Sequence, residues 1–93
     1  MPLLFEWNPR KARSNRKKHG IGFEEACTVF GDLLSITIPD VKHSEDEERW
    51  ITLGRSDQGN LLVIVHTENS VSVRLISARR ATHAERKQYE ESK

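Results

Sequence analysis

The spacing of hydrophobic residues near the end of the chain predicts a strand that leads into a helix. Apolar residues at positions 71, 73 and 75 alternate with Ser72, Arg74 and Ile76, and a period of two is typical of a β-strand with one buried face. Thr82 precedes Glu85 by three residues, which is the spacing of a capping box. We therefore expect a helix that begins at His83 and continues past Tyr89.

Three more strands are predicted upstream of this one. Residues 34–38 alternate in the same way, and residues 49–55 form a strand that ends at the turn signal of residues 57–60. Residues 61–65 are apolar at every position, which predicts a central strand covered on both faces. Short turns, including residues 67–70, connect these strands, so we expect an antiparallel meander.

The first third of the chain carries helix signals. Residues 3–7 can form a short strand, and Asn8 before a proline is a favourable N-cap for a helix that runs to about Lys18 and ends at Gly20. Residues 23–30 place apolar side chains at i, i+3, i+4 and i+7, the spacing of one buried helix face. The sequence thus predicts two helices before the meander.

The order of these elements predicts the fold class. One strand, two helices, four strands and one helix give an α+β domain, with an antiparallel sheet of four to five strands and helices packed on one face. Ninety-three residues suffice for one hydrophobic core, so residues 1–93 are expected to form a single domain. The other face, or one edge, would be open to a ligand.

Charge is distributed unevenly although the formal net charge is only +1. Residues 8–20 contain no acidic residue but six basic ones, namely Arg10, Lys11, Arg13, Arg16, Lys17 and Lys18. The helix in this segment has only Ala12 as an apolar interior residue, so it is expected at the surface. We interpret it as a contact for a polyanion or an acidic partner; the alternative is a helix that only aids solubility. The acidic segment 41–48 is predicted to be a mobile loop.

Several functional classes find no support in the sequence. Cys27 is the single cysteine, so an intrachain disulfide is excluded, and its place on the apolar helix face favours the core. The four histidines have no zinc-site spacing, and no metal or other cofactor is expected. No apolar run approaches the ~20 residues of a membrane span, and no signal peptide is recognisable. We therefore expect a cytoplasmic protein without membrane contact.

A protein that cleaves RNA need not supply the nucleophile, because the 2′-OH beside the scissile phosphate serves as one. The protein must orient the strand, move a proton and stabilise charge on the phosphate. Arginine suits the last task through its planar, bidentate fork. The candidates near the strand–helix junction, where a helix N-terminus also attracts anions, are Arg74, Arg79 and Arg80.

Other residues are candidates for proton transfer and RNA binding. The residues that could move the proton are His83, Glu48, Tyr89 and Lys11. Trp50 or Trp7 could stack a base, and the basic helix would contact RNA through Lys11, Arg13, Arg16 and Lys17. Each also has an ordinary explanation: Tyr89 and Trp7 as packing residues, His83 as a surface residue, and Glu48 as the partner of Arg49 or Lys42.

Motifs along nearly the whole chain resemble one known family. They are Phe5-Glu-Trp-Asn8, Asn15-x-x-Lys-His-Gly20, Phe23-x-x-Ala26-x-x-Val-Phe30-x-Asp32, Glu48-Arg-Trp50, Gly54 and Arg74-x-Ile-Ser-Ala-Arg79-x-Ala-Thr82-x-x-Glu-Arg86-x-x-Tyr89. Together they resemble the BrnT toxins of bacterial type II toxin–antitoxin systems. Asn8 stands where aspartate is usual, and His83 stands where a basic residue is common.

The resemblance implies a RelE-like fold and a metal-independent ribonuclease that arrests translation. It also implies a BrnA-like antitoxin that caps the toxin, with operator DNA contacted only indirectly, through the antitoxin complex. It does not assign the general base. From the residues alone, a non-catalytic nucleic-acid-binding module and an interaction protein that docks an acidic partner remain alternatives.

Two expectations concern particular surfaces. Arg79 should be the residue whose loss harms function most and the fold least, because its side chain should reach the open site. The antitoxin should place acidic groups over Arg79, Arg80 and the helix of residues 8–18, with apolar contacts across the exposed sheet face.

Overall fold

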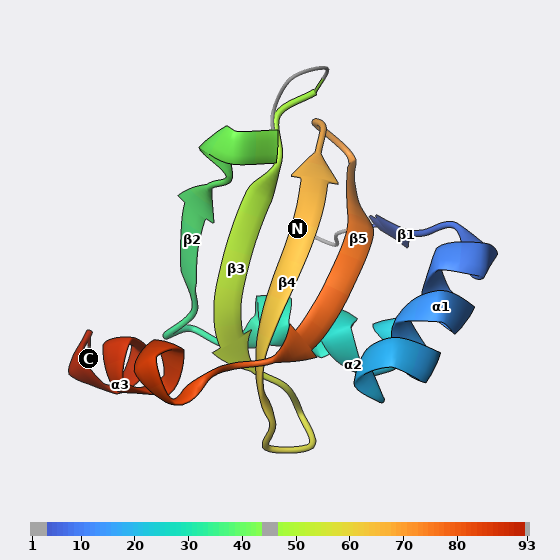
Figure 1. Ribbon diagram of the computed structural model, residues 1–93. Helices are drawn as coiled ribbons and strands as arrows, with labels where there is room; N and C mark the ends of the chain where they lie inside the picture. The colour runs from blue at the N-terminus through green and yellow to red at the C-terminus, as the bar shows by residue number, and fades with distance from the viewer. Residues whose placement is uncertain (1–3, 44–46, 93) are drawn as a thin grey trace.

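The computed structural model describes residues 4–43 and 47–92 and contains a five-stranded sheet flanked by helices (Figure 1). The strands are β1 (Leu4–Glu6), β2 (Ile36–Pro39), β3 (Trp50–Arg55), β4 (Leu61–Glu68) and β5 (Ser72–Arg80). The helices are α1 (Pro9–His19), α2 (Phe23–Cys27) and α3 (His83–Glu91), with short 3-10 helices η1 (Thr28–Gly31) and η2 (Val41–His43). This is the predicted α+β class; Leu3 and the centre of the predicted acidic loop lie outside the described residues.

The sheet has the strand order β1-β5-β4-β3-β2. Strands β2 to β5 pair antiparallel with their neighbours in the chain, as the meander predicted. Strand β1 pairs parallel with β5, however, so the sheet is mixed rather than antiparallel throughout. Strands β4 and β5 also extend beyond their predicted ends. The extension was not predicted because polar residues such as His66 interrupt the apolar pattern, whereas the hydrogen bonds between the strands continue beyond it.

The prediction that all helices pack on one face of the sheet is wrong. One face is covered by α2 and η1, and its core combines Phe23, Ala26 and Val29 with apolar residues of β4 and β5. On the opposite face a second core joins Tyr89 of α3 to Leu53, Leu61 and Val63. In Figure 1, α1 lies beside the β1–β5 edge and α3 lies at the far end of β2 and β3. Tyr89 supplies the apolar surface that brings α3 to this second face.

Two element boundaries differ from the prediction around Asp32. The expected helix of residues 23–30 leaves α-helical geometry after Cys27 and continues as η1. The expected strand of residues 34–38 begins only at Ile36, because the Asp32 carboxylate accepts the N–H of Leu34 and turns the chain. The side chain of Leu33 is 99% exposed as a result.

Asp32 also anchors the C-terminal helix. Its Oδ2 accepts a hydrogen bond of 2.6 Å from the Tyr89 hydroxyl and one of 2.9 Å from the Arg55 N–H. Burial raises the pKa of the Asp32 carboxyl, but these hydrogen bonds lower it by a larger amount. The pKa therefore lies below its usual range. The Arg55 guanidinium carbon lies 5.7 Å from the centre of the Tyr89 ring. Helix α3 is therefore tied to the loop before β2 and to β3.

Helix α1 is polar around most of its circumference, and Asn15 is its buried residue. The Asn15 amide group donates to Ala78 O at 2.8 Å and to Ile21 O at 3.1 Å, and its Oδ1 accepts from Ala78 N at 3.0 Å. Strand β1 pairs with β5 only along residues 72–74, so the amide takes over the edge hydrogen bonds of β5 further along. Along residues 4–43 and 47–92, no helix has the length and apolar character needed to cross a membrane.

Asn15 can be tested through stability. Replacing it with alanine leaves the N–H and C=O of Ala78 and the C=O of Ile21 without these partners in a buried place. We expect Asn15→Ala to lower the free energy of unfolding by about 2–4 kcal/mol. Ser14→Ala, on the exposed neighbouring position, is the control and should change it by no more than about 0.5 kcal/mol. Urea unfolding measures both, and an equally small effect at Asn15 would contradict the anchoring role.

Candidate functional site

Three adjoining hollows follow one side of β5, from its first residues to the end of α1. The first lies where β4 ends and β5 begins, the second lies between β5, the start of α1 and residues 47–49, and the third lies between α1 and Ser77. The first and second share Arg74 and Glu47, and the second and third share Lys11 and Ile76. We call this continuous depression the β5 groove.

The groove is lined by cations from β5 and α1. Arg74 belongs to β5 and alternates with the buried residues Val73 and Leu75, so its side chain is directed away from their core. Lys11 and Lys18 are seven residues apart on α1, close to two full turns, and therefore lie on one side of the helix. Among the described residues Arg74 has no side-chain hydrogen bond or ion pair, and it is exposed. It is therefore available to an anion.

Carboxylates and one aromatic ring line the first hollow together with Arg74. Glu48 and the half-buried Trp50 come from the segment that enters β3. Glu6 of β1 and Glu68 of β4 line the same hollow. The groove thus brings positive charge, proton acceptors and a stacking surface together.

A fully buried histidine, His66, lies in β4 on the sheet face that η1 covers. Its Nε2 is 2.7 Å from the Thr52 hydroxyl, and its ring meets the Phe30 ring edge-on, with centroids 4.9 Å apart. Its Nδ1 has no hydrogen-bond partner within the described residues, but Glu68 Oε2 lies 3.4 Å away. Burial lowers the pKa of His66 to about 4, so the ring is neutral at pH 7.

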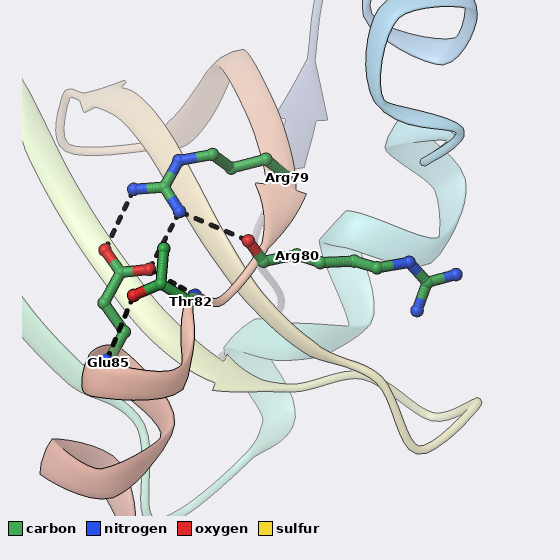
Figure 2. A network of polar contacts seen from close by, with 4 residues as sticks. All are labelled: Arg79, Arg80, Thr82 and Glu85. Atoms are coloured by element: carbon green, nitrogen blue, oxygen red, sulfur yellow. Dashed lines mark hydrogen bonds and ion pairs between the residues drawn. The ribbon is translucent and has the colours of Figure 1, made fainter.

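The other end of β5 carries the two remaining candidate arginines, and Figure 2 shows their contacts. The Arg79 guanidinium donates to both carboxylate oxygens of Glu85, at 2.8 and 2.9 Å. Glu85 also accepts from Thr82 N, and Glu85 N donates to the Thr82 hydroxyl, so the predicted capping box is confirmed. The hydrogen bonds from Arg79 lower the pKa of the Glu85 carboxyl to about 2.

This network changes the interpretation of the strand–helix junction. The N-terminus of α3, expected to attract an external anion, already holds the Glu85 carboxylate. In Figure 2 the Arg80 side chain points away from Arg79, and it donates to Asn60 Oδ1 at 2.8 Å in the β3–β4 turn. Both arginines therefore hold parts of the fold together. Arg79 was expected to reach an open site, but its guanidinium is bound to Glu85. The catalytic role of Arg79 stays a prediction.

The remaining predicted residues lie outside the β5 groove. Tyr89 is 2% exposed and belongs to the core on the opposite sheet face, where burial and its bond to Asp32 raise its pKa. His83 is exposed in the first turn of α3, and Trp7 packs edge-on against Phe23. The other cations of α1 are exposed but do not line the groove; they are Arg13, Arg16 and Lys17. The predicted set is thus divided between two ends of the molecule.

Sequence reasoning overlooked three residues of this region: Arg49, Glu68 and His66. Arg49 stands inside the motif that supplied Glu48 and Trp50, and this adjacency was a usable signal. Glu68 and His66 lie where β4 was predicted to have ended, so no pattern marked them. In the described part of the chain, no group of three or more His, Cys, Asp or Glu side chains is placed to hold a metal ion.

Comparison with known proteins places the chain in a class, the ribonuclease toxins. The family model described as "Ribonuclease toxin, BrnT, of type II toxin-antitoxin system" matches residues 7–85. The chain therefore belongs to the BrnT family of type II toxin–antitoxin systems.

The fold agrees with that of a solved structure. The crystal structure of the Brucella abortus ribonuclease toxin BrnT is similar with a TM-score of 0.70 and 21% sequence identity, over 88% of this chain and 100% of that chain. Among curated proteins, none matches the sequence.

The buried His66 makes stability depend on pH. Below pH 6.5 the unfolded chain protonates this imidazole, whereas the folded chain does so only near pH 4, so acidification favours the unfolded state. We expect the free energy of unfolding to fall by roughly 2 kcal/mol between pH 7 and pH 5. Glu85 loses its contribution only below about pH 4.5, outside this window. His66→Asn, measured by urea unfolding at both pH values, should show a flatter dependence; an unchanged slope would exclude His66 as the cause.

Proposed function

We propose that this BrnT-family chain is a metal-independent endoribonuclease that binds and cleaves RNA in the β5 groove and so arrests translation in the cytoplasm. The observation that carries the proposal is the meeting of Arg74 and Lys11 with Glu48 and Trp50 along one groove. These four residues come from β5, α1 and the entry to β3. The Arg74 guanidinium is free of internal partners among the described residues.

Each residue has a task that its chemistry suits. Arg74 meets the scissile phosphate and stabilises the charge that grows on its oxygens during attack by the 2′-OH. Lys11 adds a second positive charge beside the same phosphate. Glu48 is the predicted residue for proton transfer, and Trp50 stacks on a base next to the cleavage site. The third hollow, with Lys18, extends the path for the RNA backbone.

A toxin of a type II system has an antitoxin, and we propose a BrnA-like protein for this chain. The surface that its acidic groups would cover is defined by Arg74 and the cations of α1, because Arg79 and Arg80 are engaged inside the fold. An apolar contact is offered on the α3 face, where Ile36, Ile38 and Ile51 line a small hollow beside α3. Operator DNA would be contacted through the antitoxin complex.

Matched substitutions at the two ends of β5 should have different effects on cleavage and on stability. Arg74→Gln removes an exposed charge, so the thermal midpoint should stay unchanged while RNA cleavage falls by about 10²-fold or more. Arg79→Gln removes the bidentate partner of Glu85, so it should lower the thermal midpoint by a few degrees. Cleavage of a labelled single-stranded RNA, together with thermal unfolding of each variant, measures both effects.

Two results would decide against this assignment. If Arg74→Gln cleaves RNA at the wild-type rate, the groove is not the active site. If Arg79→Gln keeps its thermal midpoint but loses cleavage, the active site lies at the α3 end of β5, as the sequence alone suggested. Fragments ending in 2′,3′-cyclic phosphate would support attack by the 2′-OH.

Inhibition by the antitoxin should be direct. If acidic groups of the antitoxin cover the groove, a non-cleavable 2′-O-methyl RNA and the antitoxin should exclude each other. Gel shift and light scattering of toxin, antitoxin and RNA mixtures measure this competition. A stable ternary complex would show instead that the antitoxin acts from another surface, such as the α3 face.

A further inference from the structure

Helix α1 carries two lines of positive charge, and the β5 groove uses one of them. Lys11 and Lys18 line the groove. Arg10 and Lys17 each precede one of these lysines by one residue, so each points about 100° away from it around the helix. Arg13 follows Arg10 by three residues and precedes Lys17 by four, which places all three on one side of α1. We call Arg10, Arg13 and Lys17 the outer ridge.

The outer ridge is open to solvent. Its three side chains are exposed, and within residues 4–43 and 47–92 they have no hydrogen bond or ion pair. In Figure 1, α1 lies at the margin of the molecule, and none of the described elements lies on its outer side. Asn15, the buried residue of α1, donates to Ala78 of β5 and so marks the side that faces the sheet. A ligand can therefore contact the ridge along its whole length.

The positive charge of α1 is unfavourable for the helix itself. Its first turn contains no acidic residue, and Arg10 and Lys11 stand there, at the positive end of the helix dipole. Within the ridge, like charges at i, i+3 and i, i+4 spacing repel one another. A bound polyanion would relieve this repulsion. The ridge is thus better suited to binding an anionic chain than to stabilising the fold.

The side chains on the exposed side of α1 favour double-helical RNA over a single strand. From residue 10 to residue 18 the exposed side chains are cationic except for Ser14, and none is aromatic. Surfaces that bind single strands combine cations with aromatic rings on which bases stack. A duplex keeps its bases inside and presents phosphates and 2′-hydroxyl groups. Ser14 lies four residues from both Arg10 and Lys18, between the two lines, and its hydroxyl is suited to a 2′-OH.

We propose that the preferred substrate is an RNA with a double-helical stem beside an unpaired cleavage site, and that the outer ridge binds phosphates of the stem. The proposal rests on the proposed ribonuclease function. One strand leaves the stem and enters the β5 groove past Lys11 and Lys18, where Trp50 stacks on an unpaired base. The other strand follows the ridge. A helix with its side chains is about 10–12 Å across, so α1 can contact both strands over the wide minor groove of A-form RNA.

The test compares two RNAs that the protein cannot cleave. One has a stem followed by an unpaired segment with 2′-O-methyl groups, and the other is that unpaired segment alone. Affinity is measured at several salt concentrations. The combined substitution Arg10→Gln, Arg13→Gln and Lys17→Gln should weaken binding of the stem RNA by about 10- to 100-fold. It should also reduce the slope of log affinity against log salt by about two to three. Binding of the unpaired segment should change by less than about threefold, because the groove residues remain.

A second triple variant is the matched control. Lys42→Gln, Arg86→Gln and Lys87→Gln together also remove three exposed cations, but these lie outside α1 and the groove. Both variants change the net charge equally, so a difference between them reports the position of the charges. Thermal unfolding verifies that both are folded. At saturating protein, the ridge variant should cleave an unmodified stem RNA at the wild-type rate, because the ridge does not touch the reacting atoms.

The binding and cleavage results are separable. If the wild-type protein cleaves no RNA, the proposed function fails, while the binding comparison still tests the ridge. If the ridge variant and the control bind the stem RNA equally, the ridge does not bind RNA and the inference is overturned. Equal weakening for both RNAs would show that the ridge follows a single strand, which overturns the preference for a stem.

Two further results would assign the ridge to another ligand. If the ridge variant loses affinity for the antitoxin but not for the stem RNA, the ridge is a contact for the protein partner alone. If a DNA stem of the same sequence competes as well as the RNA stem, the ridge is a general duplex contact and the assignment to RNA is overturned. The proposal requires a loss that is confined to the ridge variant and to the RNA stem.

Discussion

The groove depends on one side-chain amide. Asn15 binds both backbone groups of Ala78 and so replaces a neighbouring strand with a helix along the edge of β5. Such a contact is needed because α1 has almost no apolar surface with which to pack. Through it, a helix dense in positive charge is held against a strand that carries Arg74, and the space between them becomes a polar channel. The same amide binds Ile21 and thereby fixes the chain that leads into α2.

Arginines at the two ends of β5 differ through their surroundings. At one end Glu85 completes a helix cap and also forms an ion pair with Arg79, so the positive charge of Arg79 is balanced within the protein. At the other end Arg74 lies among side chains of the groove without such a partner among the described residues. A phosphate that bound Arg79 would have to compete with a carboxylate that the capping box already holds beside that arginine. This competition is the physical reason for proposing that the ligand binds at the Arg74 end.

Local signals were sufficient for much of the fold. The capping box at Thr82, the N-cap at Asn8 and the meander all follow from short spacings, and they are confirmed. The parallel pairing of β1, the placement of α3 on the second face and the pairing of Arg79 depend on contacts between distant segments, which periodicity does not encode. Of the predicted site residues, Lys11, Glu48, Trp50 and Arg74 were chosen by residue type, and their separation from Arg79 could be seen only from the contacts of the folded chain. His66 and Glu68 were missed because a polar strand end resembles a turn.

The pairing of β5 with β4 contains one irregularity: Ser77 pairs with Val65 and Leu75 pairs with His66, so Ile76 is an extra residue on β5. Val73 and Ala78, five positions apart, consequently reach the same core, and Arg74 and Arg79 share the opposite face. In a regular strand, an odd separation would place such residues on different sides of the sheet. Inserting or deleting one residue in β5 would therefore move the side chains of half of the strand to the opposite face of the sheet. Evolution can exchange side chains along this strand far more readily than it can insert or delete one.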